Sequence, residues 1–217
     1  QALPRLPGKD KRFHVNRVQC LPWTDKGVAA FSDMKQLRSF NSGCIRALTN
    51  ESVKSISGNT GLTNLNISDN DHFDDEGLAN LRDMHQMEIL NMWHIKGIKG
   101  SGLKHLAGMT RLLELNLADC HNLQSQHFSH IKSLPSLQNL YLDNCISLDD
   151  DALAKLAGKL ELEELTIRGC EKLTEKSLTH IKTLASLKYL DISNCVAFSD
   201  QAVRMIRKAL PRCEVVR

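Results

Sequence analysis

The chain has 217 residues, of which 41% are hydrophobic and 24% charged, so it is long and apolar enough to bury a core of ordinary size. Its net charge of +3 is too small to indicate nucleic-acid binding by itself, and it lacks a run of about 18 apolar residues that could span a membrane. Aromatic residues make up only 5% of the chain, so the core must be aliphatic.

The first unit, residues 1–36, fits the pattern of the later units poorly. The segment from Gln1 to Arg5 has neither an initiating Met nor the apolar core of a signal peptide, so we expect a processed or excised start. The repeat frame extends back to Arg12, with Val15 at one of its apolar positions. Poor matches are typical of units that close an array, so residues 1–36 are interpreted as an N-terminal capping unit.

From Leu37 onward the chain repeats itself every 25 residues. Apolar residues at the first, fourth and, in most units, sixth positions predict a short strand. The first positions are Leu37, Leu62, Met87, Leu112, Leu137, Leu162 and Leu187. The fourth positions are Phe40, Leu65, Leu90, Leu115, Leu140, Leu165 and Leu190.

The second half of each unit predicts a helix. Apolar residues recur three apart, at positions 17 and 20, as on one face of a helix. Residues that can accept hydrogen bonds from the free amides of a helix start precede them in most units. These capping residues are Thr24-Asp25, Thr49-Asn50, Asp74-Asp75, Asp149-Asp150, Thr174-Glu175 and Ser199-Asp200.

A strand followed by a returning helix cannot bury its apolar side alone, but stacked units can. We therefore predict an α/β solenoid with a curved parallel inner sheet and outer helices. Residues 1–217 are expected to form a single domain, with seven repeats over 37–211 and a partial terminal strand over 212–217.

The run from Leu112 to Cys120 resembles the LxxLxLxxC/N core of leucine-rich repeats. The 25-residue period and the cysteines at position nine, Cys120, Cys145, Cys170 and Cys195, are similar to the cysteine-containing subclass of these repeats. That subclass is best known from the substrate receptors of F-box ubiquitin ligases. The resemblance implies a leucine-rich-repeat solenoid and, as one alternative, substrate recognition for a ligase whose adaptor-binding segment would lie upstream of Gln1.

The seven cysteines include no CxxC pair and no zinc-finger spacing. In a parallel sheet the position-nine thiols would form a line rather than a tetrahedron, so we expect buried, reduced thiols that donate weakly to a neighbouring turn. Reduced cysteines indicate an intracellular compartment, with the cytoplasm, the nucleus and the organelles left open.

Enzyme signatures are absent from the sequence, which has no GxSxG, P-loop or HExxH motif. The acidic run Asp149–Asp151 begins a predicted helix and is interpreted as a cap. We therefore expect no catalytic residue, no cofactor and no metal.

The strand positions that face away from the helices form the concave face, and they are predominantly acidic. Three basic residues stand there, Arg38, Arg168 and Lys188. The acidic residues are Asp69, Glu88, Glu114, Asp119, Asp143, Glu163, Glu164 and Asp191. A nucleic-acid reader would gather basic residues on this face, so the pattern favours a protein partner with a basic surface or segment, without membrane insertion.

Aromatic and charged residues of the concave face are the candidate partner-binding site. They are Trp93, His94, Glu114, Asn116, Asp119, Tyr141, Asp143, Arg168, Tyr189 and Asp191. We expect the carboxylates of Asp119 and Asp143 to serve a partner rather than the fold. The other interpretation is that the acidic residues are simply solvated and that Trp93 covers a neighbouring strand.

Two further patterns leave alternatives open. The asparagines at position five, Asn41 to Asn116, can hydrogen-bond along the sheet as a structural ladder. The outer face carries a stripe at position 19, His105, His130, Lys155 and His180, which a solvated helical surface explains and which could also dock an acidic partner. A structural subunit of a large assembly is a further alternative to the interaction scaffold.

Overall fold

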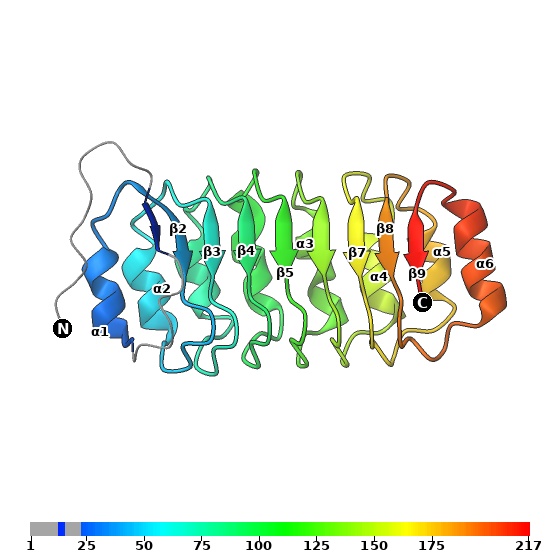
Figure 1. Cartoon of the computed structure of the whole chain (residues 1–217), viewed down its shortest axis with the longest axis horizontal. Helices are drawn as coiled ribbons and strands as arrows, with labels where there is room; N and C mark the ends of the chain where they lie inside the picture. Colours follow the sequence, from blue (N-terminus) through cyan, green and yellow to red (C-terminus); the bar gives the residue numbers. More distant parts are fainter. Residues whose placement is uncertain (1–12, 16–22) are drawn as a thin grey trace.

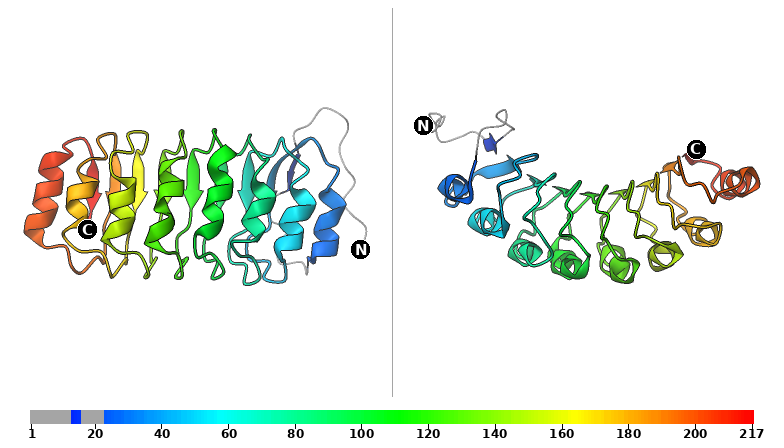
Figure 2. Two further views of the ribbon diagram at one scale, coloured as in Figure 1. Left: turned by 180° about the vertical axis from the view of Figure 1, so that it is seen from behind. Right: turned by 90° about the horizontal axis from the view of Figure 1, so that it is seen from below.

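The computed structural model describes residues 13–15 and 23–217, which form a row of stacked repeats (Figure 1) that curves into an arc (Figure 2). Within these residues, nine strands form one parallel sheet in the order of the sequence. They are β1 (Phe13–Val15), β2 (Leu37–Asn41), β3 (Asn64–Asn66), β4 (Ile89–Asn91), β5 (Glu114–Asn116), β6 (Asn139–Tyr141), β7 (Glu164–Thr166), β8 (Tyr189–Asp191) and β9 (Glu214–Val216). The rest of the expected N-terminal capping unit, residues 1–12 and 16–22, lies outside the described residues.

Short helical segments line the outside of the arc, and the strands line its inside (Figure 2). The α-helices are α1 (Asp25–Val28), α2 (Asn50–Ile56), α3 (Phe128–Lys132), α4 (Asp150–Leu156), α5 (Ser177–Ile181) and α6 (Asp200–Ala209). The 3₁₀ segments are η1 (Ala29–Phe31), η2 (Gly77–Leu81), η3 (Ser101–Gly108) and η4 (Ser125–His127). Across the described part of the chain, no helix has the length and apolar character needed to cross a bilayer.

From β2 to β9 the sheet keeps one register, in which each residue pairs with the residue 25 positions later, as Leu115 does with Leu140. The leucines at the first and fourth positions are buried between sheet and helices, and both Leu115 and Leu140 have no exposed surface. Neighbouring repeats therefore complete each other's core, and the predicted α/β solenoid with a parallel inner sheet is confirmed.

The outer segments differ from the uniform helices that the pattern predicts, because several are 3₁₀ rather than α-helical. A 3₁₀ helix rises about 2.0 Å per residue against about 1.5 Å in an α-helix, so fewer residues cross the width of the repeat. The repeats also pack closely here: a side chain at Gly102, in η3, would collide with the backbone oxygen of Asp75 in the preceding repeat.

After each of the strands β2 to β8 the chain turns through a residue in the left-handed conformation, at position eight of the repeat. The residues are Cys44, Asp69, His94, Asp119, Asn144, Gly169 and Asn194. Asn, Asp, His and Gly adopt this conformation more readily than other residues, which accounts for their use here. This requirement explains why Asp69 and Asp119 stand at the edge of the concave face.

The position-five asparagines support this turn rather than forming a ladder. The Oδ1 atoms of Asn66, Asn91 and Asn116 each accept a hydrogen bond, at 2.9 Å, from the backbone amide two residues later. The expected bonding along the sheet is therefore replaced by bonding within each repeat, a common use of asparagine at turns.

The position-nine cysteines are buried, and each thiol donates to a carbonyl of the preceding repeat. Cys145 Sγ lies 3.2 Å from Leu117 O, and Cys170 Sγ lies 3.2 Å from Leu142 O. Burial raises the pKa of Cys170 to about 12, so its thiol stays protonated and can donate. The interpretation of these cysteines as buried weak donors agrees with this geometry.

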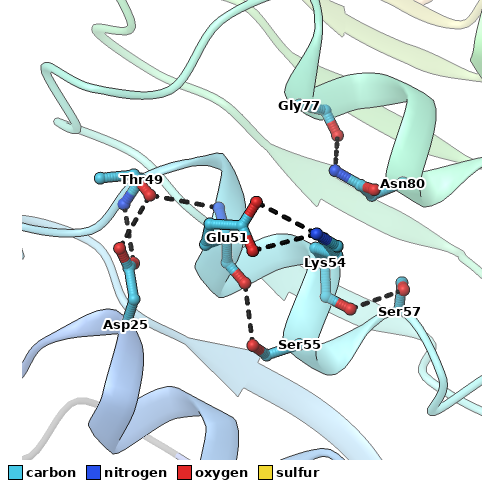
Figure 3. A network of polar contacts seen from close by, with 8 residues as sticks. All are labelled: Asp25, Thr49, Glu51, Lys54, Ser55, Ser57, Gly77 and Asn80. Carbon is cyan, nitrogen blue, oxygen red and sulfur yellow. Dashed lines mark hydrogen bonds and ion pairs between the residues drawn. The ribbon is translucent and has the colours of Figure 1, made fainter.

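Acidic residues at the helix starts join each repeat to the next. In Figure 3, Thr49 accepts a bond from the amide of Glu51 as the cap of α2, and its own hydroxyl donates to Asp25, at 2.8 Å. Asp150 does the same five repeats along, accepting from the amide and hydroxyl of Thr174 at 2.8 and 2.6 Å. The predicted capping role of these acidic residues thus extends between repeats.

We predict that Leu140→Ala lowers the free energy of unfolding by about 2–5 kcal/mol, because it opens a cavity in a fully buried position. Leu160→Ala is the matched control, since Leu160 is 58% exposed. Chemical denaturation of both variants measures the difference. Equal, small effects would show that the assigned register is wrong.

We predict that Asp150→Ala destabilises the chain by about 1–2 kcal/mol at pH 7. Burial alone would raise the pKa of Asp150, but hydrogen bonds from Ser177 and Thr174 outweigh it and hold the pKa below its ordinary value. The ionised form therefore stabilises the fold above the unfolded pKa, and this contribution is lost as the pH falls through the folded one.

Denaturation between pH 7 and pH 2 checks this dependence, with Asp151→Ala as the control, because the Asp151 side chain pairs only with Lys155 on the helix surface. A deficit in Asp150→Ala that does not shrink in acid would contradict the bridging role.

Candidate functional site on the concave face

The concave face is built from rows of side chains, because every strand shares one register. At position three, one such row runs Glu114, Asn139, Glu164, Tyr189 and Glu214 across β5 to β9. Carboxylates thus recur on alternate strands, about 10 Å apart at the usual strand spacing. We call Glu114, Glu164 and Glu214 the carboxylate row.

Basic residues neutralise three of the acidic residues that the sequence places on this face. The pairs, measured from nitrogen to oxygen, are Arg46–Asp69 at 3.3 Å, Arg111–Glu88 at 3.0 Å and Lys188–Glu163 at 2.6 Å. Arg46 and Arg111 lie outside the strand positions used for the charge count, so the count overstates the free negative charge.

Asp119 serves the fold, contrary to the expectation that it serves a partner rather than the fold. Its Oδ2 accepts from the indole nitrogen of Trp93 at 2.5 Å, and its Oδ1 accepts from Asn144 Nδ2 at 2.9 Å. Its backbone is left-handed, with φ of 59°. Charge reversal at Asp119 would therefore break the turn as well as alter the surface.

Asp143 also serves the fold, so the expectation that it serves a partner rather than the fold is corrected here as well. Its carboxylate accepts from the hydroxyl of Thr166 and from the backbone amide of Arg168, both at 2.9 Å. Burial raises the pKa of Asp143 above its ordinary value, and these two bonds only partly offset the effect. Asp191 likewise caps its own turn through the amide of Ser193.

Glu114 and Glu164 are left as carboxylates without an ion pair among the described residues. Burial, and then the charge of Glu164, raise the pKa of Glu114 above its ordinary value. Tyr141 stands near both: burial and the charges of Glu114 and Glu164 raise its pKa to about 12. The negative potential of the concave face is therefore concentrated on β5 to β7.

A hollow of about 290 Å³ lies beside this row, at the carboxyl ends of the middle strands. Six of the ten predicted site residues line it: Trp93, Asn116, Asp119, Tyr141, Asp143 and Arg168. Ala118 and Asn144 complete the lining and were missed by the sequence argument, which looked for aromatic and charged side chains. What distinguishes Ala118 in the structure is its small side chain, which stands between the larger side chains of Trp93 and Asp143.

The other predicted residues lie on the concave face but outside this hollow. Glu114 and Tyr189 belong to the position-three row, and Asp191 lies one row above. His94 turns toward its neighbours, with ring centroids 5.2 Å from Trp93 and 6.1 Å from His121. The structure thus places six of the ten residues around the hollow and Glu114 in the carboxylate row, while Tyr189, Asp191 and His94 lie elsewhere on the face.

The described ranges, 13–15 and 23–217, contain no group of three His, Cys, Asp or Glu side chains placed to hold a metal ion. Burial raises the pKa of the Cys120 thiol to about 12, which disfavours the nucleophilic thiolate. The geometry of this face is suited to binding by charge and shape.

Comparison with known proteins identifies the fold. No family model matches the sequence, and no curated protein matches it. Among solved structures, a chain from the crystal structure of the yeast Rad7–Elc1 complex is similar, with a TM-score of 0.62 and 18% identity over 89% of this chain. The match spans 60% of that chain. Together with the repeat pattern, the architecture is that of a leucine-rich-repeat solenoid.

We predict that Glu114→Gln stabilises the chain at pH 7, by up to about 1 kcal/mol. The pKa of Glu114 is raised in the fold, so its ionisation opposes folding, and the parent loses stability as the pH rises through that pKa. Glutamine removes the penalty, so the variant's advantage should vanish below about pH 4. Denaturation at pH 7 and pH 3.5 tests this, and a variant less stable than the parent at pH 7 would contradict it.

Proposed function

We propose that this chain is a non-catalytic scaffold that binds a protein partner through its concave face, and that the partner contributes a basic segment. The observation that carries the proposal is the carboxylate row, in which Glu114 and Glu164 are half-buried and form no ion pair among the described residues. A partner's lysines or arginines would supply the missing charge.

The raised pKa of Glu114 supports this proposal, because it marks a place where the isolated chain is less stable than it could be. Such local destabilisation is common where a surface is kept for binding rather than for folding. Trp93, which is 37% exposed, adds an aromatic contact of the kind that dominates interface energies.

The finer assignments belong to this proposal as well. We place residues 1–36 as the N-terminal cap of one repeat domain and 212–217 as its partial last strand, in the cysteine-containing subclass. The likeness to a chain crystallised in a Rad7–Elc1 complex favours a place in a multi-protein assembly. Substrate recognition for a ubiquitin ligase is the second candidate, carried by that likeness and by the cysteine at position nine.

The test uses a peptide of about ten residues with blocked ends, in which every third residue is Lys and the others are Gly or Ser. Three extended residues span about 10 Å, which matches the spacing of the carboxylate row. We predict that the parent binds it with an affinity that falls as salt is raised. The double variant E114Q/E164Q should bind about tenfold more weakly in fluorescence anisotropy.

The matched control is E76Q/D83N, which also removes two negative charges but does so on either side of η2, on the helical side of the repeat. An equal loss of affinity in both double variants would show that binding depends on the overall charge and not on the concave face. No loss in E114Q/E164Q would overturn the proposed binding face.

A further inference from the structure

The hollow beside the carboxylate row exists because of one small residue. Trp93, Ala118, Asp143 and Arg168 occupy position seven of four successive repeats, and all four line the hollow. Ala118 is 5% exposed and forms the floor, while its larger neighbours rise on both sides. Asn116 and Tyr141, which end β5 and β6 two residues before Ala118 and Asp143, also line the hollow.

The wall formed by Trp93 is held in place. Its indole nitrogen donates to Asp119, and the ring stacks obliquely on His94 at 5.2 Å. Because Asp119 is in turn held by Asn144, the indole is oriented before any ligand arrives. A fixed aromatic face is the arrangement that attracts cations through the ring quadrupole.

The charge of the lining is net negative. Its charged side chains are two carboxylates, Asp119 and Asp143, and one guanidinium, that of Arg168, and His121 Nε2 lies 3.7 Å from Asp119 Oδ1 outside the lining. Each carboxylate accepts the two bonds described above and keeps further lone pairs. Glu114 and Glu164 lie below on the same strands, so the surrounding potential is negative as well.

We infer that this hollow receives one lysine or arginine side chain of the basic segment, with its cation against the indole of Trp93 and between Asp119 and Asp143. The inference rests on the proposed function and deepens it, because it assigns an anchor position within the concave face. The alkyl part of such a side chain would lie over Ala118.

Arg168 limits the affinity of this anchor. Its guanidinium forms no ion pair with any described acidic residue, and it carries the same charge as the proposed guest. Removing it as Arg168→Gln should therefore tighten the binding of a basic peptide, by about threefold. If the hollow held an anion instead, the same change would abolish binding.

The experiment fills the hollow with Ala118→Met in a Trp23→Phe background, where Trp93 is the one remaining tryptophan. The probe is the lysine peptide described above. We expect the parent background to bind it with a change in Trp93 emission. Ala118→Met should weaken binding about tenfold and abolish the emission change.

Ser193→Met is the matched control, because Ser193 occupies position seven of a later repeat, outside the hollow. Thermal denaturation confirms that both methionine variants are folded. If E114Q/E164Q weakens binding but Ala118→Met does not, the hollow is no anchor and the scaffold proposal stands. If neither variant weakens binding, the proposed binding of a basic segment to the concave face is refuted, and the anchor falls with it. Binding of a glutamate peptide that Arg168→Gln abolishes would overturn the inference in favour of an anion.

Discussion

A single repeat of this chain cannot bury its own leucines, and this constraint governs the rest of the structure. Leu115 and Leu140 lose all exposure only because the repeats on either side cover them. Burial of each such side chain contributes about 1.5–3 kcal/mol, so the array gains stability by keeping a constant 25-residue register. That register places the same position of every repeat in one row, which is why the concave face has rows at all.

The same constraint determines which acidic residues are free. Wherever the strand ends, the chain needs a left-handed residue and a side chain that satisfies the amides of the turn, so Asp119 and Asp143 are used by the fold. Side chains at position three, at the start of the strand, do not have to satisfy the amides of the turn. Glu114 and Glu164 therefore form no ion pair among the described residues, and they give the face its negative potential.

Much of the fold could be predicted from the sequence because the spacing of leucines depends on local pattern alone. Strand positions, cap residues and the solenoid follow from that spacing, whereas the spacing does not distinguish the 3₁₀ segments from the α-helices. The candidate site was predicted only in outline. Arg46 and Arg111 neutralise concave acids from outside the strands, which no count by position can show.

The burial of Lys159 is a second feature that the repeat pattern could not predict. Lys159 is only 2% exposed, although most other repeats carry Met or Leu at this position. Its ammonium group lies against Leu134 O, at 2.5 Å, and burial lowers its pKa. Similarly, nothing in the sequence marks Ala118 as the floor of a hollow, because the hollow is defined by the size of its neighbours.

The central claim is that a basic partner lies on the concave face rather than on the helices. Carboxyl footprinting of the chain, alone and in the complex purified from its native cell, tests this claim most directly. The account predicts that Glu114 and Glu164 become protected while Asp83, on the helical side, stays reactive. Protection of Asp83 with unchanged labelling of Glu114 and Glu164 would contradict it.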